Sequence, residues 1–554
     1  MAPPDIPAAK RAGLPVDLER LSREGDAWLT PEDRYALKTH GVCTQAQGGV
    51  FMIRIRIPGG VVLTDQVRVI ARAARHHGAN WVHLTTRQNA ELHWVDSAHV
   101  AGVLASLERG GLSTRSSCGH TLRNVMCSED AGVGLDEPFD CLPDARAVSD
   151  AIVARSARLN CVLPSRVNLA FGGSPRCRED ALVNDGAFVS VLDASTGEPG
   201  YEVWAGGSLG KSPRLAVRLG EFVPRRHVLA AAEALIELFV QHGDLEHPGK
   251  GRMKFVVDRL GEDVFRDAWT KTFARCRRDA AYVPAPVDVV GDTARHAILA
   301  AVPDGGWSRG VRPQRIAGLA SLTVDVPMGD LHAADVELLA DLADRHADGA
   351  LTLSRDQSVV LRNVAVDDVA AVRVRLAERN LALVDESPVA TVRACTGSAV
   401  CALGITDAPA TGTELLLSPA LARHNSIRVH VSGCPNSCAQ HQLGDIGLAG
   451  TKVRVPGRGS MTDGFHVYLG ADPAGREVGQ VVGRVAGDDV PLAVDAVVGA
   501  WEAMRHGNEP VGRTVRRVGI DAFAAHLDAV LADRWATGPE PEQPDDDAAV
   551  SAAN

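Results

Sequence analysis

The chain has 554 residues, a formal net charge of −11, 45% hydrophobic residues and 23% charged residues, which are the proportions of a soluble globular protein. The acidic balance argues against a nucleic-acid-binding protein, because such proteins usually carry a basic excess. No stretch approaches the ~20 apolar residues of a membrane helix, and the start of the chain lacks the apolar core of a secretion signal. We therefore expect a cytoplasmic protein of about three or four domains that binds neither nucleic acid nor membrane.

In chain order, the first predicted segment is an N-terminal extension at residues 1–45, whose first ~20 residues we expect to lie outside any core. The next segment begins with FMIRIRIPGG at Phe51 and ends with HLTTRQNAELHWV. Its alternating apolar residues, Pro-Gly turn and helical apolar spacing predict a strand, a turn, a helix and a second strand that ends near Arg87.

The same pattern returns from Ala320, in ASLTVDVPMGDLHAADVELLADLADRHADGALTLSRDQSVVLRNV. Pro327 matches Pro58, and Arg355 matches Arg87 at an offset of 268 residues. A repeat of this length indicates a duplicated α+β unit.

The similarity continues downstream, where GGSPRCREDALVNDGAF in the first copy matches SGCPNSCAQHQLGDIGL in the second. Pro175 lies over Pro435 and Asp185 over Asp445. The whole chain is therefore predicted to be an internally duplicated α+β protein.

The two copies differ at a pair of thiols. Cys434 and Cys438 of the second copy stand where the first copy has Ser174 and Arg178. If the fold needed these thiols for packing, both copies would be expected to keep them. The asymmetry therefore favours a ligand role in the second copy.

A second thiol pair, Cys395 and Cys401, lies upstream in VRACTGSAVCALGITD, whereas the other cysteines are scattered singly. A four-thiolate site binds either zinc or an iron–sulfur cluster. Structural zinc sites favour pairs spaced by two to four residues, so the five-residue spacing here favours a cluster. Four buried thiols without a ligand are the remaining interpretation.

These motifs together resemble the sirohaem-dependent sulfite and nitrite reductases. The resemblance rests on Cys-x5-Cys followed by Cys-x3-Cys, on TTRQN in the first half, and on FMIRIRIPGG, RNVMC, GGSLG and GKGRMKF, and it covers most of residues 35 to 530. It implies two ferredoxin-like half-domains, at 46–110 and 310–385, and two sirohaem/Fe-S-binding α+β domains, at 111–300 and 386–535, with a pseudo-twofold relation. Residues 536–554 are acidic and rich in Pro and Ala, and we expect a disordered tail there.

The resemblance also implies cofactors and their ligands. A [4Fe-4S] cluster would be held by the four clustered cysteines, Cys395, Cys401, Cys434 and Cys438. In this family the last of these also ligates the sirohaem iron, so Cys438 would couple the two cofactors. Arg123 and Asn124 resemble a turn that anchors the sirohaem, and Asn436 would lie close to both cofactors.

Sirohaem carries eight carboxylates and the substrates are small oxyanions, and both are bound well by the planar fork of arginine. Arg87, Lys250 and Arg252 resemble the family's anion-binding cations. The fourth position departs from the family, because LPSRV places Ser165 in the usual arginine slot and Arg166 one place later. Since side chains alternate along a strand, either Arg166 turns into the site or another cation replaces it.

The expected function is the six-electron reduction of sulfite to sulfide, slightly favoured by the positive charge at residue 252, or of nitrite to ammonia. The chain has no Walker loop and no dinucleotide fingerprint, so ferredoxin is the first choice of electron donor and a flavoprotein reductase the second. One alternative is a precorrin-3B synthase-like oxygenase of cobalamin biosynthesis, to which the shifted arginine gives weight. The other is a zinc-stabilised binding protein without catalysis. A chain that carries both halves suggests that a monomer can be complete.

Overall fold

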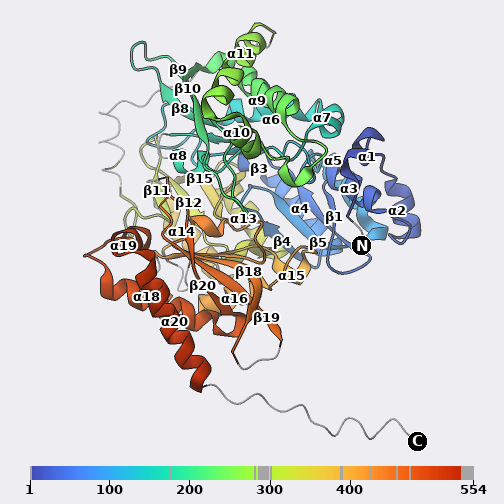
Figure 1. The fold of residues 1–554 in the computed structure, drawn as a ribbon. Coiled ribbons are helices and arrows are strands. Elements are labelled where there is room, and N and C mark those ends of the chain that lie inside the picture. The colour runs from blue at the N-terminus through green and yellow to red at the C-terminus, as the bar shows by residue number, and fades with distance from the viewer. Residues whose placement is uncertain are drawn as a thin grey trace, which may run out of the picture.

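The computed structural model describes residues 3–174, 177–279, 282–284, 299, 302–386, 391–424, 426–456, 460–472 and 476–537. Pro175 and residues 538–554, which make up almost all of the expected disordered tail, lie outside these ranges. The described chain is built on four five-stranded sheets with helices packed on them (Figure 1). No helix in the described ranges is both long and apolar enough to cross a bilayer.

Two of the sheets belong to the repeated strand–turn–helix–strand units. The first has the order β1 (Val42–Thr44), β2 (Val50–Ile55), β5 (Ala90–Asp96), β4 (Trp81–Leu84), β13 (Asp330–His332). The second has the order β11 (Val311–Pro313), β12 (Leu319–Val324), β15 (Val359–Ala365), β14 (Ala350–Leu353), β3 (Val61–Leu63).

Each of these sheets takes its last strand from the other copy. Strand β13 of the second copy pairs antiparallel with β4, and β3 of the first copy pairs antiparallel with β14. The helices that follow these two strands, α4 (Thr64–His77) and α13 (Ala333–His346), pack against each other. The half-domains predicted as separate units therefore share their sheets and a single hydrophobic core.

The other two sheets have the same mixed topology as each other. In the first copy, β6 (Met126–Cys127), β7 (Leu169–Gly172) and β8 (Gly186–Leu192) are parallel, and β9 (Pro199–Ala205) and β10 (Val217–Pro224) continue antiparallel. In the second copy, β16 (Thr391–Ala394), β17 (Arg428–Ser432) and β18 (Ile446–Arg454) are parallel, and β19 (Met461–Leu469) and β20 (Gln480–Ala486) continue antiparallel. The matching order is strong support for the predicted duplication.

An equivalent aspartate fixes the same turn in both copies. Asp185, before β8, accepts a hydrogen bond from the backbone N–H of Asn168 at 2.9 Å. Asp445, before β18, accepts one from the backbone N–H of Arg428, also at 2.9 Å. The alignment of Asp185 with Asp445 is thus confirmed.

Helices cover these two larger sheets at opposite ends of the molecule (Figure 1). Those of the first copy are α6 (Leu142–Val153), α7 (Ser156–Val162), α8 (Arg178–Ala181), α9 (Val228–His242), α10 (Met253–Leu260) and α11 (Glu262–Asp279). Those of the second are α15 (Gly397–Val400), α16 (Ala408–Leu416), α17 (Pro419–Arg423), α18 (Val490–Met504), α19 (Val511–Val518) and α20 (Ile520–Thr537). Helices α5 (Val100–Arg109) and α14 (Val369–Ala377) occupy equivalent places in the repeated units.

The N-terminal segment corrects one expectation. It forms α1 (Ile6–Arg11), α2 (Leu18–Glu24) and α3 (Pro31–Thr39), drawn in dark blue at the edge of Figure 1. Leu21 belongs to the core of the half-domains, and Ala9 and Leu14 are buried in a smaller cluster. The first residues are therefore part of the packed structure, because their few apolar side chains cover the wall of the first copy.

A buried lysine ties this segment to the larger domain. Lys10 is 2% exposed, and its Nζ donates to the carbonyl oxygens of Asn160 at 2.6 Å and Leu163 at 2.7 Å. Burial lowers the pKa of Lys10 to about 8. The segment it holds leads directly into Ser165 and Arg166.

Candidate cofactor and anion site

Two glutamines that the repeat places at equivalent positions hold the centre of the molecule together. Gln88, with φ 54°, donates from Nε2 to the carbonyl oxygens of Cys127 and Leu353, both at 2.8 Å. Gln357, with φ 64°, donates to those of Leu84 at 2.8 Å and Ala394 at 3.1 Å. Each turn is thereby fixed to the other copy. Sequence reasoning missed these residues, although both follow the repeated arginine.

The turn of Gln88 also carries Arg87 to the thiol-bearing loop. Thr86 Oγ1 donates to the carbonyl oxygen of Cys438 at 2.8 Å. Asn124 fixes the same turn, because its Nδ2 donates to the carbonyl oxygens of Arg87 at 3.1 Å and Gln88 at 3.2 Å. The role that the structure gives Asn124 is therefore to position Arg87.

Four of the predicted cations gather at this point: Arg87, Arg123, Arg166 and Arg252. Burial lowers the pKa of Arg87 to about 10, and the nearby charge of Arg252 lowers it further. The charge of Arg252, then burial and the other two guanidiniums, lower the pKa of Arg166 well below its usual value, whereas Cys438 raises it. These shifts show that the cations are close to one another and to Cys438. Arg166 therefore reaches the cluster despite the shifted motif.

The cation cluster has spare hydrogen-bonding capacity. Within the described ranges, the guanidiniums of Arg87 and Arg166 make no hydrogen bond or ion pair. Arg123 donates to the carbonyl oxygens of Ser117 at 2.7 Å and Gly119 at 2.9 Å. Crowded, partly buried cations without carboxylate partners are costly unless an anion compensates them. Their chemistry fits a polycarboxylate macrocycle and a small oxyanion.

Arg252 differs from its neighbours because it is already paired. It precedes α10, and its guanidinium binds the fully buried carboxylate of Asp185 at 2.9 and 3.0 Å. Asp185 therefore offsets part of the Arg252 charge and fixes its position.

Two lysines flank Arg252, and they differ in exposure. Lys250 ends a short 3-10 turn, Pro248–Lys250, and is exposed, with no side-chain partner in the described part of the chain. Lys254, which sequence reasoning missed, is buried and donates to the carbonyl oxygens of Leu209 at 3.3 Å and of Ser212. Burial, with the charge of Arg252, lowers the pKa of Lys254 to about 8.

The four predicted ligand thiols face one another at the ends of two parallel strands. Cys395 follows β16 and Cys401 follows α15, whereas Cys434 and Cys438 follow β17. Burial, and then the thiol of Cys438, raise the pKa of Cys395 to about 12. Burial also raises the pKa values of Cys401 and Cys434, and Cys438 contributes to both shifts.

Peptide N–H groups point at these sulfur atoms. Gly433 N–H donates to Cys395 Sγ at 3.2 Å, and further backbone N–H groups lower the pKa values of Cys395, Cys401 and Cys434. Among the described residues, no group of three or more His, Cys, Asp or Glu side chains is arranged to hold one metal ion. A donor set of four thiols with surrounding N–H groups fits the thiolates of an iron–sulfur cluster.

Cys438 is the exposed member of the four, whereas Cys434 is buried. Asn436, between them, is also exposed. The loop is supported from the first copy, because Gln442 Nε2 donates to the Gly210 carbonyl oxygen at 2.9 Å and Ser437 Oγ donates to Gln442 Oε1. Gly210 belongs to GGSLG, so this motif packs directly against the thiol-bearing loop.

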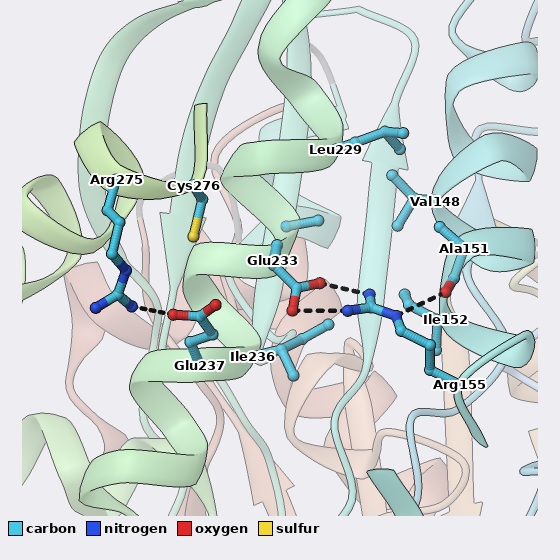
Figure 2. A pocket seen from close by; sticks show the side chains of 11 residues that line it. Val148, Ala151, Ile152, Arg155, Leu229, Glu233, Ile236, Glu237, Arg275 and Cys276 are labelled. Atoms are coloured by element: carbon cyan, nitrogen blue, oxygen red, sulfur yellow. Dashed lines mark hydrogen bonds and ion pairs between the residues drawn. The ribbon is translucent and has the colours of Figure 1, made fainter. Parts of the chain in front are cut away.

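A separate cavity of about 270 Å³ lies between α6, α9 and α11 (Figure 2). Its rim carries the ion pairs of Arg155 with Glu233 and of Arg275 with Glu237. None of the predicted site residues lines it. The site described above is therefore distinct from this cavity.

Comparisons with known proteins agree with this arrangement. The family model "Nitrite and sulphite reductase 4Fe-4S domain" matches residues 118–275 and 386–534. The model "Nitrite/Sulfite reductase ferredoxin-like half domain" matches residues 44–110 and 312–379.

Curated relatives cover most of the chain. The "Ferredoxin--nitrite reductase" of Synechococcus elongatus is 31% identical over 83% of this chain and 88% of its own length. The "Sulfite reductase [ferredoxin] 1" of Mycolicibacterium paratuberculosis is 29% identical over 76% of this chain and 73% of its own. The solved structure of the Mycobacterium tuberculosis NirA protein has a TM-score of 0.79 and 24% identity, and it covers 94% of this chain and 98% of its own. That structural likeness supports the duplicated α+β fold.

Proposed function

The chain belongs to the nitrite and sulphite reductase 4Fe-4S family, and we propose that it reduces a small oxyanion by six electrons at a sirohaem coupled to a [4Fe-4S] cluster. One observation carries this proposal. The hydrogen bond from Thr86 to the Cys438 carbonyl joins the turn that bears Arg87 to the loop that bears the thiols. Cations for an anion and thiols for a redox centre thus meet at one place.

The residues present fit both groups. We propose that Cys395, Cys401, Cys434 and Cys438 hold the cluster and that Cys438, the exposed thiol, also ligates the sirohaem iron. Arg123 and the backbone around Asn436 would contact the macrocycle. When bound, these cofactors supply the electrons and the iron centre at which sulfur or nitrogen is reduced.

The side chains of the site bind the anion and handle protons. Arg87 and Arg166 hold its oxygens and offset the negative charge that develops as an oxygen leaves. Arg252, fixed by Asp185, supplies a further donor. Lys250 and Lys254 are the candidate proton donors. Since burial lowers the pKa of Lys254 to about 8, its ammonium releases a proton more readily than that of an exposed lysine.

We propose sulfite as the first substrate, because residue 252 carries a permanent positive charge where some nitrite reductases resembling this chain carry a neutral amide. Nitrite is the second candidate for two reasons. The relative from Synechococcus elongatus is named a nitrite reductase. In addition, the ion pair with Asp185 reduces the charge that Arg252 presents to a substrate.

Ferredoxin is the proposed electron donor, since relatives named for both substrates are ferredoxin enzymes. A flavoprotein reductase remains the second choice. The family assignment favours the reductase over the oxygenase and zinc-protein alternatives, and we propose a cytoplasmic enzyme that is complete as a monomer.

Two measurements on the purified holoenzyme test this function. Its absorption spectrum should show a Soret band with a further band at the red end, and a colourless zinc-containing protein would contradict the proposal. With reduced ferredoxin as donor, kcat/KM for sulfite should exceed that for nitrite. The reverse order would make nitrite the substrate.

A further inference from the structure

Two thiols outside the predicted ligand set lie at the edge of the cation cluster. Cys43 is in the middle of β1, and Cys118 lies in the segment that leads to Arg123. The two thiol groups are hydrogen-bonded to each other. Cys43 is partly exposed, whereas Cys118 is 2% exposed.

The backbone holds these two segments side by side. Ser116 N–H donates to the Thr39 carbonyl oxygen at 2.8 Å, just before β1. Ser117 Oγ donates to the Arg54 carbonyl oxygen at 3.0 Å. Gly41 approaches so closely that a Cβ there would lie 2.8 Å from Ser117 Oγ. The contact between the thiols is therefore built into the fold and does not depend on one rotamer.

The surroundings favour a thiolate on one sulfur. The hydrogen bond from Cys43 lowers the pKa of Cys118 to about 6 against the effect of burial, and the charges of Arg54 and Arg123 lower it further. The pKa of Cys43 is raised by the hydrogen bond with Cys118 and by burial. A thiolate beside a protonated thiol is the pairing that thiol oxidation requires, because the thiolate is the nucleophile.

We propose that Cys43 and Cys118 are a redox modification site, at which hydrogen peroxide converts the dithiol into a reversible disulfide. The Cys118 sulfur attacks the O–O bond, hydroxide leaves, and Cys118 becomes a sulfenic acid. The Cys43 sulfur then attacks the Cys118 sulfur, the S–O bond breaks, and water leaves with the Cys43 proton. Two thiols and one peroxide thus give one disulfide and two water molecules.

The modification would act on the neighbouring site. It removes a negative charge that Arg54 and Arg123 face, and it joins β1 covalently to the segment that places Arg123. The proposal concerns the thiols themselves and does not depend on which anion the protein reduces.

Peptide mass spectrometry of the holoenzyme tests this site. Cleavage after Lys and Arg places Cys43 in residues 39–54 and Cys118 in residues 116–123, with one cysteine in each peptide. After brief treatment with hydrogen peroxide and blocking of free thiols with N-ethylmaleimide, we expect the two peptides to be cross-linked. Their joint mass should be about 2 Da below the sum of the thiol forms, because two hydrogens leave. Dithiothreitol should separate them again.

Controls make the result decisive. Cys161→Ser, at a partly exposed cysteine outside the pair, should keep the cross-link, and Cys43→Ser should abolish it and leave oxidised Cys118 as sulfenic or sulfinic acid. The proposal is overturned if unmodified protein gives both peptides blocked by N-ethylmaleimide after peroxide, or if either cysteine is cross-linked mainly elsewhere. This readout comes from the unmodified sequence, so it does not depend on the folding of a variant.

Discussion

Arg87 and Arg166 of the first copy have no carboxylate partner in the described residues, whereas the arginines at the equivalent face of the second copy are paired. That face is a cavity of about 370 Å³. Arg312 binds Asp130 at 2.7 Å, and Arg393 binds Asp356. The same framework thus leaves cations available on one side and neutralises them on the other.

The thiol positions show the reverse pattern. In the first copy Arg178, at the position of Cys438, binds Glu202 at 2.7 and 2.8 Å. Glu137 lies directly against Gly173, the equivalent of Gly433, and burial raises its pKa to about 9. Protein side chains therefore fill the space that the second copy leaves for a cluster. Duplication supplied two frameworks, and each kept one half of a joint site.

Exchanging the critical thiol should break this asymmetry most severely. Cys438→Ser should lose the cluster and the macrocycle together and lower kcat by more than about a thousandfold, as happens when one member of a cooperating unit is removed. Iron analysis and the absorption spectrum report the loss. Arg178→Ser, at the equivalent position, is the matched control and should keep both cofactors. Retention of cluster and activity by Cys438→Ser would refute the bridging assignment.

The repeated arginines give the next largest difference. Arg87→Ala should lower kcat/KM by about 10²–10³-fold, because it removes one preorganised donor to the anion. Arg355→Ala should leave kcat/KM of the folded protein nearly unchanged. Steady-state kinetics with one reduced ferredoxin compare the two variants, and equal losses would contradict the division of roles.

The two glutamines should sharpen the comparison in the opposite sense, because here the copies are alike. Gln88→Ala and Gln357→Ala each leave buried carbonyl groups without a donor, so each should lower the free energy of unfolding by about 1–3 kcal/mol. Urea denaturation measures this, with the exposed Gln47→Ala as control. A loss confined to one glutamine would show that the centre is not symmetrical.

The smallest predicted effect concerns pH and the N-terminal segment. Lys10 has a folded-state pKa of about 8 against 10.5 when unfolded, so between these values the unfolded chain binds more protons. The stability contributed by Lys10 should therefore rise as pH increases from 8 to 10.5, by about 1–3 kcal/mol. Unfolding of the natural protein and of Lys10→Met across this window measures the difference, which should be flat for the exposed Arg11→Met.

Much of the fold and site was accessible from sequence because it depends on local pattern. The repeated alternation and helical spacing predicted the strand–turn–helix–strand units, and the family motifs led to Arg87, Arg123 and Cys438. The strand exchange was not accessible, since a pattern of two residues identifies a strand but does not name its partner.

The details that sequence reasoning missed depend on long-range packing. Lys10 and Lys254 are buried only because distant carbonyl groups accept from them, and nothing in their local sequence marks this. Lys250 is the opposite case: its motif predicts an anion ligand, yet the structure exposes its side chain. Side-chain direction at a helix start is set by tertiary contacts, which here place Arg252 on Asp185.

The exchange of β3 and β13 has a consequence for synthesis on the ribosome. The edge of β4 stays uncovered until β13, which ends at His332, has emerged. At the usual rate of translation this delay lasts roughly 10–50 s. An open strand edge is a template for wrong pairing, so the nascent first half should depend on its own helices, or on a chaperone, until the second half arrives to close it.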